Sequence, residues 1–224
     1  MGLDRTEHDT PDGEADRAAV WLASSSPRRR DLLKGAGVRY GWSSPGIDDG
    51  ELVAGRWARM HPEWWVAALA HLKARAGLAA RARAGEQPLP VLGGDTVCVA
   101  RGRIIGQPAD EAEARATLGL LMSEEHAVLT GMALVGPEPS ERDVFVSSAT
   151  VRFGAIDAMD VENYVRSGQW RGKAGAYNLT ERLEDGWPIA FEGEPGTIVG
   201  LPIEAVLRRW GARLKVSGAT GIAP

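Results

Sequence analysis

The stretch Val20-Trp21-Leu22-Ala23-Ser24-Ser25-Ser26-Pro27-Arg28-Arg29-Arg30 decides how this chain begins to fold. The apolar run over residues 18–23 is typical of a buried strand. Ser26 is a favoured N-cap and Pro27 suits the first helical position, so a helix is expected to start here. The stretch therefore predicts a strand that passes directly into a helix.

Three arginines, Arg28 to Arg30, occupy the first turn of that helix. The first turn carries the positive end of the helix dipole and favours acidic residues, so these cations are locally unfavourable. An anion bound over the helix end, held by free backbone N–H groups and guanidinium groups, would remove the conflict. A solvated basic patch that tolerates the dipole is the alternative.

Composition bounds the class of protein. The 224 residues suit one large domain or two closely joined lobes, and the net charge is -4, with 26 basic against 30 acidic residues. Nucleic-acid binding is therefore not the first expectation, although a local basic cleft stays open. The single cysteine, Cys98, excludes an internal disulfide and lies in an apolar run, where inert packing is expected.

The ends of the chain differ in composition from its middle. Residues 1–17 are mostly polar and are expected to form a disordered extension, residues 18–214 a single domain, and residues 215–224 a flexible tail. No run approaches the length of a membrane helix, and the N-terminus lacks the apolar segment of a signal peptide. A cytoplasmic protein without membrane contact is expected.

Strands and helices alternate along the chain, which predicts a mixed-sheet α/β protein with two lobes around a cleft. Expected strands cover residues 18–23, 38–42, 91–100, 103–105, 127–135, 144–153 and 187–191. One expected helix begins at residue 27, and four others cover residues 61–84, 109–122, 157–166 and 202–214.

Asp95 interrupts the apolar run over residues 91–99. A carboxylate in such a run must be paired, bound to a metal, or placed at the edge of a cleft. Gly93 and Gly94 leave room for a ligand or another backbone to come close. The alternative is a turn aspartate that bonds to its own backbone.

Other charged residues are less informative by themselves. Asp48 and Asp49 share a loop with Glu51, and such a loop holds Mg²⁺ or Mn²⁺ in some proteins and is a solvated turn in others. Lys73 taken alone resembles a surface lysine. The segment Lys173-Ala174-Gly175-Ala176-Tyr177 fits either the wall of a nucleotide site or a packed turn.

Together these pieces resemble the Maf family of nucleoside triphosphate pyrophosphatases. The matching segments occur in the family's order from about Val20 to Trp210. They are Leu22-Ala23-Ser24-Ser25-Ser26-Pro27-Arg28-Arg29, Ile47-Asp48-Asp49, Lys73-Ala74, Gly94-Asp95-Thr96-Val97, Ile105-Gly106-Gln107-Pro108, His126-Ala127-Val128-Leu129-Thr130-Gly131, Lys173-Ala174-Gly175-Ala176-Tyr177 and Val199-Gly200-Leu201-Pro202.

The resemblance implies an elongated mixed sheet flanked by helices, with the site between two lobes. It also implies a hydrolase of nucleotide metabolism, which converts a nucleoside triphosphate to a monophosphate and pyrophosphate with a divalent cation, Mg²⁺ or Mn²⁺. Family members act as housecleaning enzymes on non-standard or surplus nucleotides, and some are linked to cell-division arrest. The implied partner is the nucleotide, without nucleic acid.

The resemblance also assigns roles to residues. Asp95 would be the general base and, with Asp49, a metal ligand, and losing Arg29 is expected to reduce activity about as strongly as losing Asp95. Arg30 has no counterpart in the family motif. The implied substrate-binding residues are Ser24, Ser26, Arg28, Arg29, Lys73, Gln107, Lys173 and Thr180.

Several positions depart from the family pattern. Asp49 replaces a glutamate, Gln107 a lysine, Thr180 the glutamine of many pyrimidine-nucleotide members, and Gly196-Thr197 a Ser-Asn pair. Neither the dTTP/UTP preference nor the 7-methyl-GTP preference of the family is therefore carried over. These departures also leave open a nucleotide-binding regulatory protein with little turnover.

Tryptophan is frequent, with 8 residues in the chain. Trp57, Trp64 and Trp65 lie before or within the expected long helix. They are suited to a core, a base pocket or the face of a homodimer, and the sequence does not choose among these roles.

Overall fold

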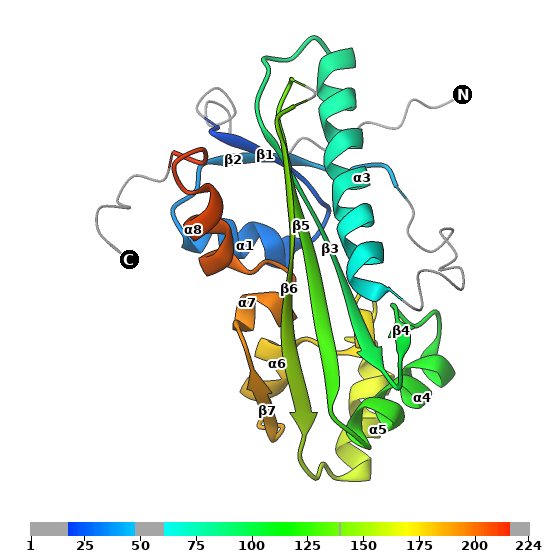
Figure 1. The fold of residues 1–224 in the computed structure, drawn as a ribbon. Helices are drawn as coiled ribbons and strands as arrows, with labels where there is room; N and C mark the ends of the chain where they lie inside the picture. The colour runs from blue at the N-terminus through cyan, green and yellow to red at the C-terminus, as the bar shows by residue number, and fades with distance from the viewer. Residues whose placement is uncertain (1–17, 48–60, 139, 216–224) are drawn as a thin grey trace, which may run out of the picture.

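The computed structural model describes residues 18–47, 61–138 and 140–215, which form a seven-stranded mixed sheet flanked by helices (Figure 1). This confirms the expected fold class. The strands are β1 (Val20–Ala23), β2 (Tyr40–Ser43), β3 (Val91–Ala100), β4 (Arg103–Ile105), β5 (His126–Val135), β6 (Arg142–Phe153) and β7 (Ile189–Glu192). The helices are α1 (Pro27–Gly35), α3 (Pro62–Arg83), α4 (Glu111–Met122), α5 (Ala158–Ser167), the 3-10 turn η3 (Ala174–Ala176), α6 (Leu179–Glu184), α7 (Pro195–Val199) and α8 (Ile203–Trp210).

The sheet has the strand order β2-β1-β3-β5-β6-β7, and β4 pairs with β3. β1 runs parallel to both of its neighbours, whereas the pairs from β3 to β7 are antiparallel. Helix α3 lies along one face of the long strands, and α1 and α8 lie on the other (Figure 1). The sheet is therefore covered on both faces near β1.

Two separate hydrophobic cores lie on the face that α3 does not cover. One surrounds Leu92 and Leu134 and includes side chains of α1 and α8. The other surrounds Cys98 and Val128 and includes side chains of α4 and α5. Since alternate side chains of a strand point to one face, the intervening positions on this face belong to polar residues, among them Thr96 of β3 and Thr130 of β5. The two cores form the two lobes, and the polar band lies between them.

One edge of β3 is paired only at its two ends. β1 is in register with β3 from Trp21↔Val91 to Ala23↔Gly93, and β4 pairs with it from Cys98 to Ala100. In the part of the chain that the structure describes, no strand pairs with the edge of residues 94–97 between them. Because β1 ends beside this gap and leads into α1, Asp95 and the arginine-rich helix start meet there.

Helix α3 packs unusually close to the sheet. A Cβ added to Gly93 would lie 2.4 Å from the carbonyl oxygen of Ala70, and one added to Gly131 would lie 2.4 Å from that of Val66. Glycine at these positions lets the helix backbone touch the strands. The expectation that Gly93 makes room for another backbone is confirmed.

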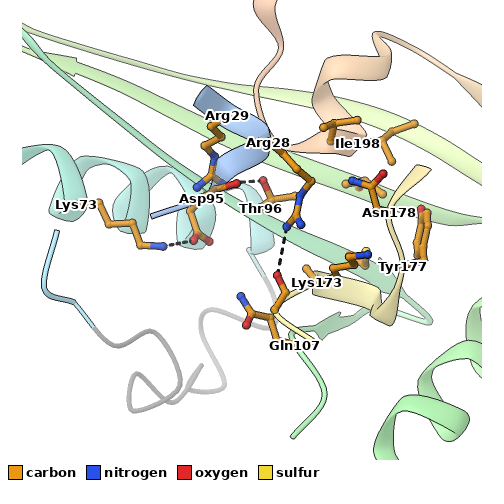
Figure 2. A pocket seen from close by; sticks show the side chains of 16 residues that line it. Arg28, Arg29, Lys73, Asp95, Thr96, Gln107, Lys173, Tyr177, Asn178 and Ile198 are labelled. Atoms are coloured by element: carbon orange, nitrogen blue, oxygen red, sulfur yellow. Dashed lines mark hydrogen bonds and ion pairs between the residues drawn. The ribbon is translucent and has the colours of Figure 1, made fainter. Parts of the chain in front are cut away.

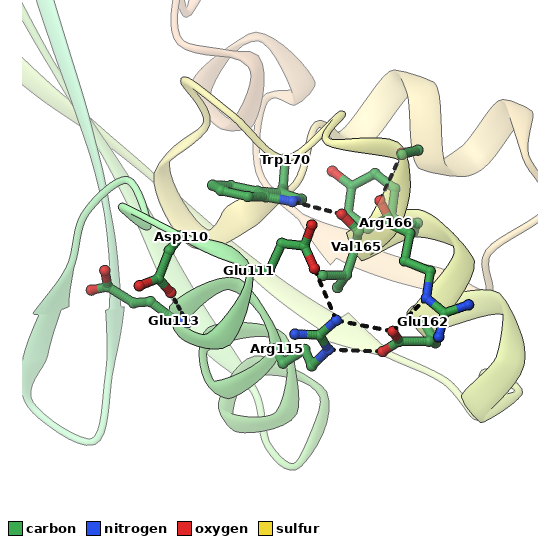
Figure 3. Close-up of polar contacts among 10 residues, drawn as sticks. Asp110, Glu111, Glu113, Arg115, Glu162, Val165, Arg166 and Trp170 are labelled. Atoms are coloured by element: carbon green, nitrogen blue, oxygen red, sulfur yellow. Dashed lines mark hydrogen bonds and ion pairs between the residues drawn. The ribbon is translucent and has the colours of Figure 1, made fainter.

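Helices α4 and α5 are joined by exposed ion pairs around Glu162 (Figure 3). Its carboxylate accepts from Arg115 Nε at 2.8 Å and from Arg166 Nε at 2.9 Å, and Arg115 also contacts Glu111 at 3.1 Å. Such solvent-exposed pairs contribute little stability. The buried Trp170, whose indole N–H donates to the carbonyl of Val165 at 2.8 Å, ties the segment after α5 back to that helix.

Two helices were not expected from the sequence, α6 and α7, because each spans no more than six residues. The closing helix ends at Trp210 instead of residue 214, although Leu214 is still buried. Residues 1–17 and 216–224 lie outside the described residues, so the proposed domain limits stay predictions. No helix among the described residues is long and apolar enough to cross a membrane.

The tryptophans near α3 differ in their surroundings. The side chain of Trp64 is 67% exposed, and Trp65 packs against the small core around Val66. Neither lines the cleft described below, which leaves a dimer face as the open prediction for Trp64. Trp57 lies outside the described residues.

Candidate active site

A cleft of about 110 Å³ opens between the lobes, beside the unpaired edge of β3 (Figure 2). Its lining includes four basic side chains and one carboxylate, that of Asp95. The far end is less polar and is bounded by Cys98, Val128, Tyr177 and Ile198. One end of this cleft, the inner hollow, is thus suited to anions and the other to a flat, mostly apolar group.

A second hollow of about 440 Å³, the outer hollow, adjoins the inner hollow toward the start of α1. The residues shared by the two hollows are Ser26, Arg28, Arg29, Lys73, Gln107 and Gly172. The outer hollow adds Ser24, Ser25 and Arg171, and no carboxylate is among its lining residues in the described part of the chain. The two hollows form one continuous basic groove.

Asp95, in the inner hollow, forms a buried ion pair with Lys73, which lines both hollows. The distance between Lys73 Nζ and Asp95 Oδ1 is 2.7 Å, and each side chain is 9% exposed. Lys73 comes from the middle of α3 and reaches Asp95 because the helix backbone lies directly on Gly93. The appearance of a surface lysine was therefore wrong, since this side chain is buried at the cleft.

The three arginines of α1 point in three directions. Arg28 donates to the carbonyl oxygen of Gly172 at 3.2 Å, across the cleft. Arg29 is only 8% exposed. Arg30 lies over the ring of Trp42, 3.9 Å from its centroid, and lines neither hollow.

Arg29 starts a chain of buried hydrogen bonds through the polar band. It donates from Nε to the carbonyl of Gly200 at 2.7 Å, from Nη1 to Ser24 Oγ at 3.0 Å and from Nη2 to Thr96 Oγ1 at 3.1 Å. The hydroxyls of Thr96 and Thr130 are 2.9 Å apart, and Thr130 donates to the carbonyl of Thr197 at 2.7 Å. Since the Thr130 proton is used there, Thr96 must donate to Thr130 and accept from Arg29. The hydrogen bonds therefore all run in one direction, from the Arg29 donor through Thr96 and Thr130 to the carbonyl of Thr197.

The segment before α6 forms the opposite wall of the cleft. Lys173 contacts the carboxylate of Glu181, and burial is the main cause that lowers the pKa of its ammonium group from the usual value, against the effect of Glu181. Gly175 donates its N–H to the carbonyl of Gly106 at 3.0 Å, and its φ of 71° is one that glycine adopts freely. This bond joins the wall to the loop that carries Gln107.

A buried histidine supports the apolar end of the cleft. His126 Nε2 lies 3.0 Å from the hydroxyl of Tyr177, and Phe153 stacks on the imidazole ring. Burial lowers the pKa of His126 from the usual 6.5 to about 4. Burial also raises the pKa of Cys98 to about 12, so this cysteine stays a thiol, as inert packing requires.

This histidine predicts a loss of stability in mild acid. Between pH 6.5 and 4 the unfolded chain binds a proton at His126 that the folded protein does not. Because of this proton, the free energy of unfolding should fall by about 2 kcal/mol from pH 7 to 4.5. Urea unfolding of wild type and His126→Gln at both pH values measures it. From pH 7 to 4.5 the free energy of unfolding of the variant should fall by about 2 kcal/mol less than that of wild type, and equal decreases would contradict the expectation.

Comparison with known proteins assigns the family. The Maf-like protein family model matches residues 19–210. The chain belongs to the Maf-like family. It is 36% identical over 200 residues, 88% of this chain and 98% of the relative, to the dTTP/UTP pyrophosphatase of Cupriavidus pinatubonensis. The enzymes of the same name from Burkholderia thailandensis and Hahella chejuensis are also 36% identical, over 82% and 86% of this chain and 88% and 90% of theirs.

Membership of the Maf-like family confirms the expected kind of enzyme, a nucleotide pyrophosphatase. The structure brings most of the expected site residues together. Ser24, Ser26, Arg28, Arg29, Lys73, Asp95, Gln107 and Lys173 all line one or both hollows. Thr180, which is exposed on α6, lines neither hollow, and Asp49 lies outside the described residues.

Asn178, two residues before Thr180, lines the inner hollow and was not expected to. It caps α6, where its side chain accepts from the N–H of Glu181 at 3.0 Å. The sequence held a signal for it, because an asparagine three residues before a glutamate is a typical helix start. The departure at Gly196 has a local cause, since a Cβ there would lie 2.4 Å from the carbonyl oxygen of Leu201.

The described residues alone do not make a metal site in this member of the Maf-like family. Among them no three histidine, cysteine or carboxylate side chains come together in a way that could hold an ion. Asp95 supplies a single carboxylate at the cleft, and the ammonium group of Lys73 lies 2.7 Å from it.

Proposed function

We propose that this chain hydrolyses a nucleoside triphosphate to the monophosphate and pyrophosphate, with Asp95 as the general base. The observation that carries the proposal is the position of Asp95, the one carboxylate among the described lining residues of a cleft with four basic side chains. The cations suit the charge of a triphosphate. A carboxylate in the same place would weaken simple phosphate binding, so its presence favours catalysis over binding alone.

In the proposed reaction, Asp95 accepts a proton from a water molecule while the water oxygen bonds to the α-phosphorus. The bond from that phosphorus to the bridging oxygen breaks, and pyrophosphate leaves with the bonding electron pair. Lys73 holds the Asp95 carboxylate at 2.7 Å and keeps it oriented. Arg28 and Lys173 stabilise the charge on the phosphate oxygens from opposite walls of the cleft.

The proposal includes a divalent cation, Mg²⁺ or Mn²⁺, bound by Asp95 with Asp49. When bound, such an ion neutralises phosphate charge and orients the substrate. We expect excess EDTA to abolish pyrophosphate release and added Mg²⁺ or Mn²⁺ to restore it. Unchanged turnover after chelation and dialysis would contradict the metal requirement, and the assay is the rate of pyrophosphate formation.

Pyrimidine nucleotides are the first substrates to test, because the relatives are named dTTP/UTP pyrophosphatases. Gln107, which lines both hollows, replaces the lysine of the family pattern, so the panel of nucleotides extends beyond dTTP and UTP. A housecleaning role in the cytoplasm remains part of the proposal.

The decisive experiment is pyrophosphate release from a panel of canonical and modified nucleoside triphosphates with each metal. We expect turnover of at least one nucleotide by wild type. Tight nucleotide binding without pyrophosphate release across the panel would instead indicate a regulatory binding protein.

A further inference from the structure

The outer hollow contains one cation that the recognised sequence motifs leave unused, Arg171. It lines this hollow together with Arg28, Arg29 and Lys73, and no carboxylate of the described residues lines it with them. Arg171 does not line the inner hollow, where Asp95 lies. Among the described residues, four cations and one carboxylate thus line the inner hollow, whereas four cations and no carboxylate line the outer hollow.

The local structure holds the guanidinium of Arg171 in place. It lies over the ring of Trp170, 4.6 Å from the centroid, and Trp170 is itself anchored in the core. Gly168, which ends α5 with a φ of 71°, lies next to Arg171 Nη1, so the guanidinium packs against the end of this helix. Stacking on an aromatic ring leaves the N–H edges of an arginine available for hydrogen bonds.

A second contact brings this segment to the start of α1. The neighbouring residue, Gly172, accepts a hydrogen bond from Arg28 at 3.2 Å. Arg28 and Arg171 therefore reach the same hollow from two lobes. Two guanidinium groups on one hollow suit a multiply charged anion such as pyrophosphate.

The direction of the substrate follows from the residues that the hollows share. Asp95 lines only the inner hollow, Lys73 lines both, and Arg171 lines only the outer one. If Asp95 acts at the α-phosphorus, the β- and γ-phosphates extend into the outer hollow. We propose that Arg171 binds this pyrophosphate half of the substrate and the pyrophosphate product, an inference that rests on the proposed function.

The test is the affinity for inorganic pyrophosphate, measured by calorimetry at constant ionic strength in Mg²⁺ buffer, together with KM for the best nucleotide. Arg171→Gln should weaken pyrophosphate binding and raise KM by about two- to fivefold, the range for one exposed charged contact. Its kcat should change less than its KM, since Arg171 does not reach the reacting atoms. The pyrophosphate affinity and the KM of Arg171→Lys should lie between those of wild type and Arg171→Gln.

Arg30→Gln is the matched control. Arg30 is half-buried and also stacks on a tryptophan, but it lines neither hollow, so its removal should change neither quantity. Equal affinity of Arg171→Gln and wild type, or an equal loss in Arg30→Gln, would overturn the inference. If wild type releases pyrophosphate from no nucleotide and does not bind it, the proposed function fails as well. If wild type is active and only Arg171→Gln shows no effect, the inference about Arg171 fails alone.

Discussion

Replacing Asp95 with asparagine should lower kcat by about 10²- to 10⁴-fold, the usual contribution of a general base. The amide has nearly the shape of the carboxylate but accepts no proton from water at neutral pH. It also removes the negative charge that Lys73 faces at 2.7 Å. KM should change much less, because the basic side chains of the groove remain. Pyrophosphate release under saturating nucleotide measures the effect.

Asp143→Asn provides a matched control for this substitution. Asp143 is also a strand carboxylate in an ion pair, 2.7 Å from Arg209, but it lines neither hollow. Its variant should keep the turnover of wild type, even if its melting temperature falls. Asp95→Asn with kcat within a few-fold of wild type would remove Asp95 from the role of base.

Local signals in the sequence were enough for the long elements and for Asp95. A carboxylate inside an apolar run is conspicuous wherever the chain folds, so Asp95 could be selected before its surroundings were known. Its partner could not, because Lys73 and Asp95 are 22 positions apart and meet only where α3 rests on Gly93. Nothing in the residues around Lys73 indicates that contact.

The start of α1 shows the same limit. The sequence predicted a helix with unfavourable cations in its first turn, and the helix begins at Pro27 as expected. It could not tell which arginine is buried, since that depends on Thr96 and Gly200, which come from distant parts of the chain. Thr180 was placed by family position alone, and the helix that carries it outside the cleft was not expected.

Arg29→Met should reduce both stability and activity. Arg29 is 8% exposed and joins α1 to β3 and to the loop after α7, so its loss leaves the carbonyl of Gly200 and the hydroxyl of Thr96 without a donor. We expect a loss of about 2–4 kcal/mol in the free energy of unfolding. The kcat/KM should fall about 100-fold, because the pocket wall shifts and a cation is lost. Urea unfolding and initial rates measure the two effects.

Arg28→Met separates these two contributions, because Arg28 lines the same hollows but is only half-buried and makes one long hydrogen bond, to Gly172 at 3.2 Å. It should lose activity with nearly unchanged stability. Arg29→Lys should recover little of either, since one ammonium group cannot reach Gly200, Ser24 and Thr96 in the fixed planar geometry of a guanidinium. Wild-type stability in Arg29→Met would show that Arg29 serves the phosphates alone. The buried hydrogen bonds argue instead that the anion expected over the helix start meets Arg28 first, while Arg29 holds α1 against β3 and the loop after α7.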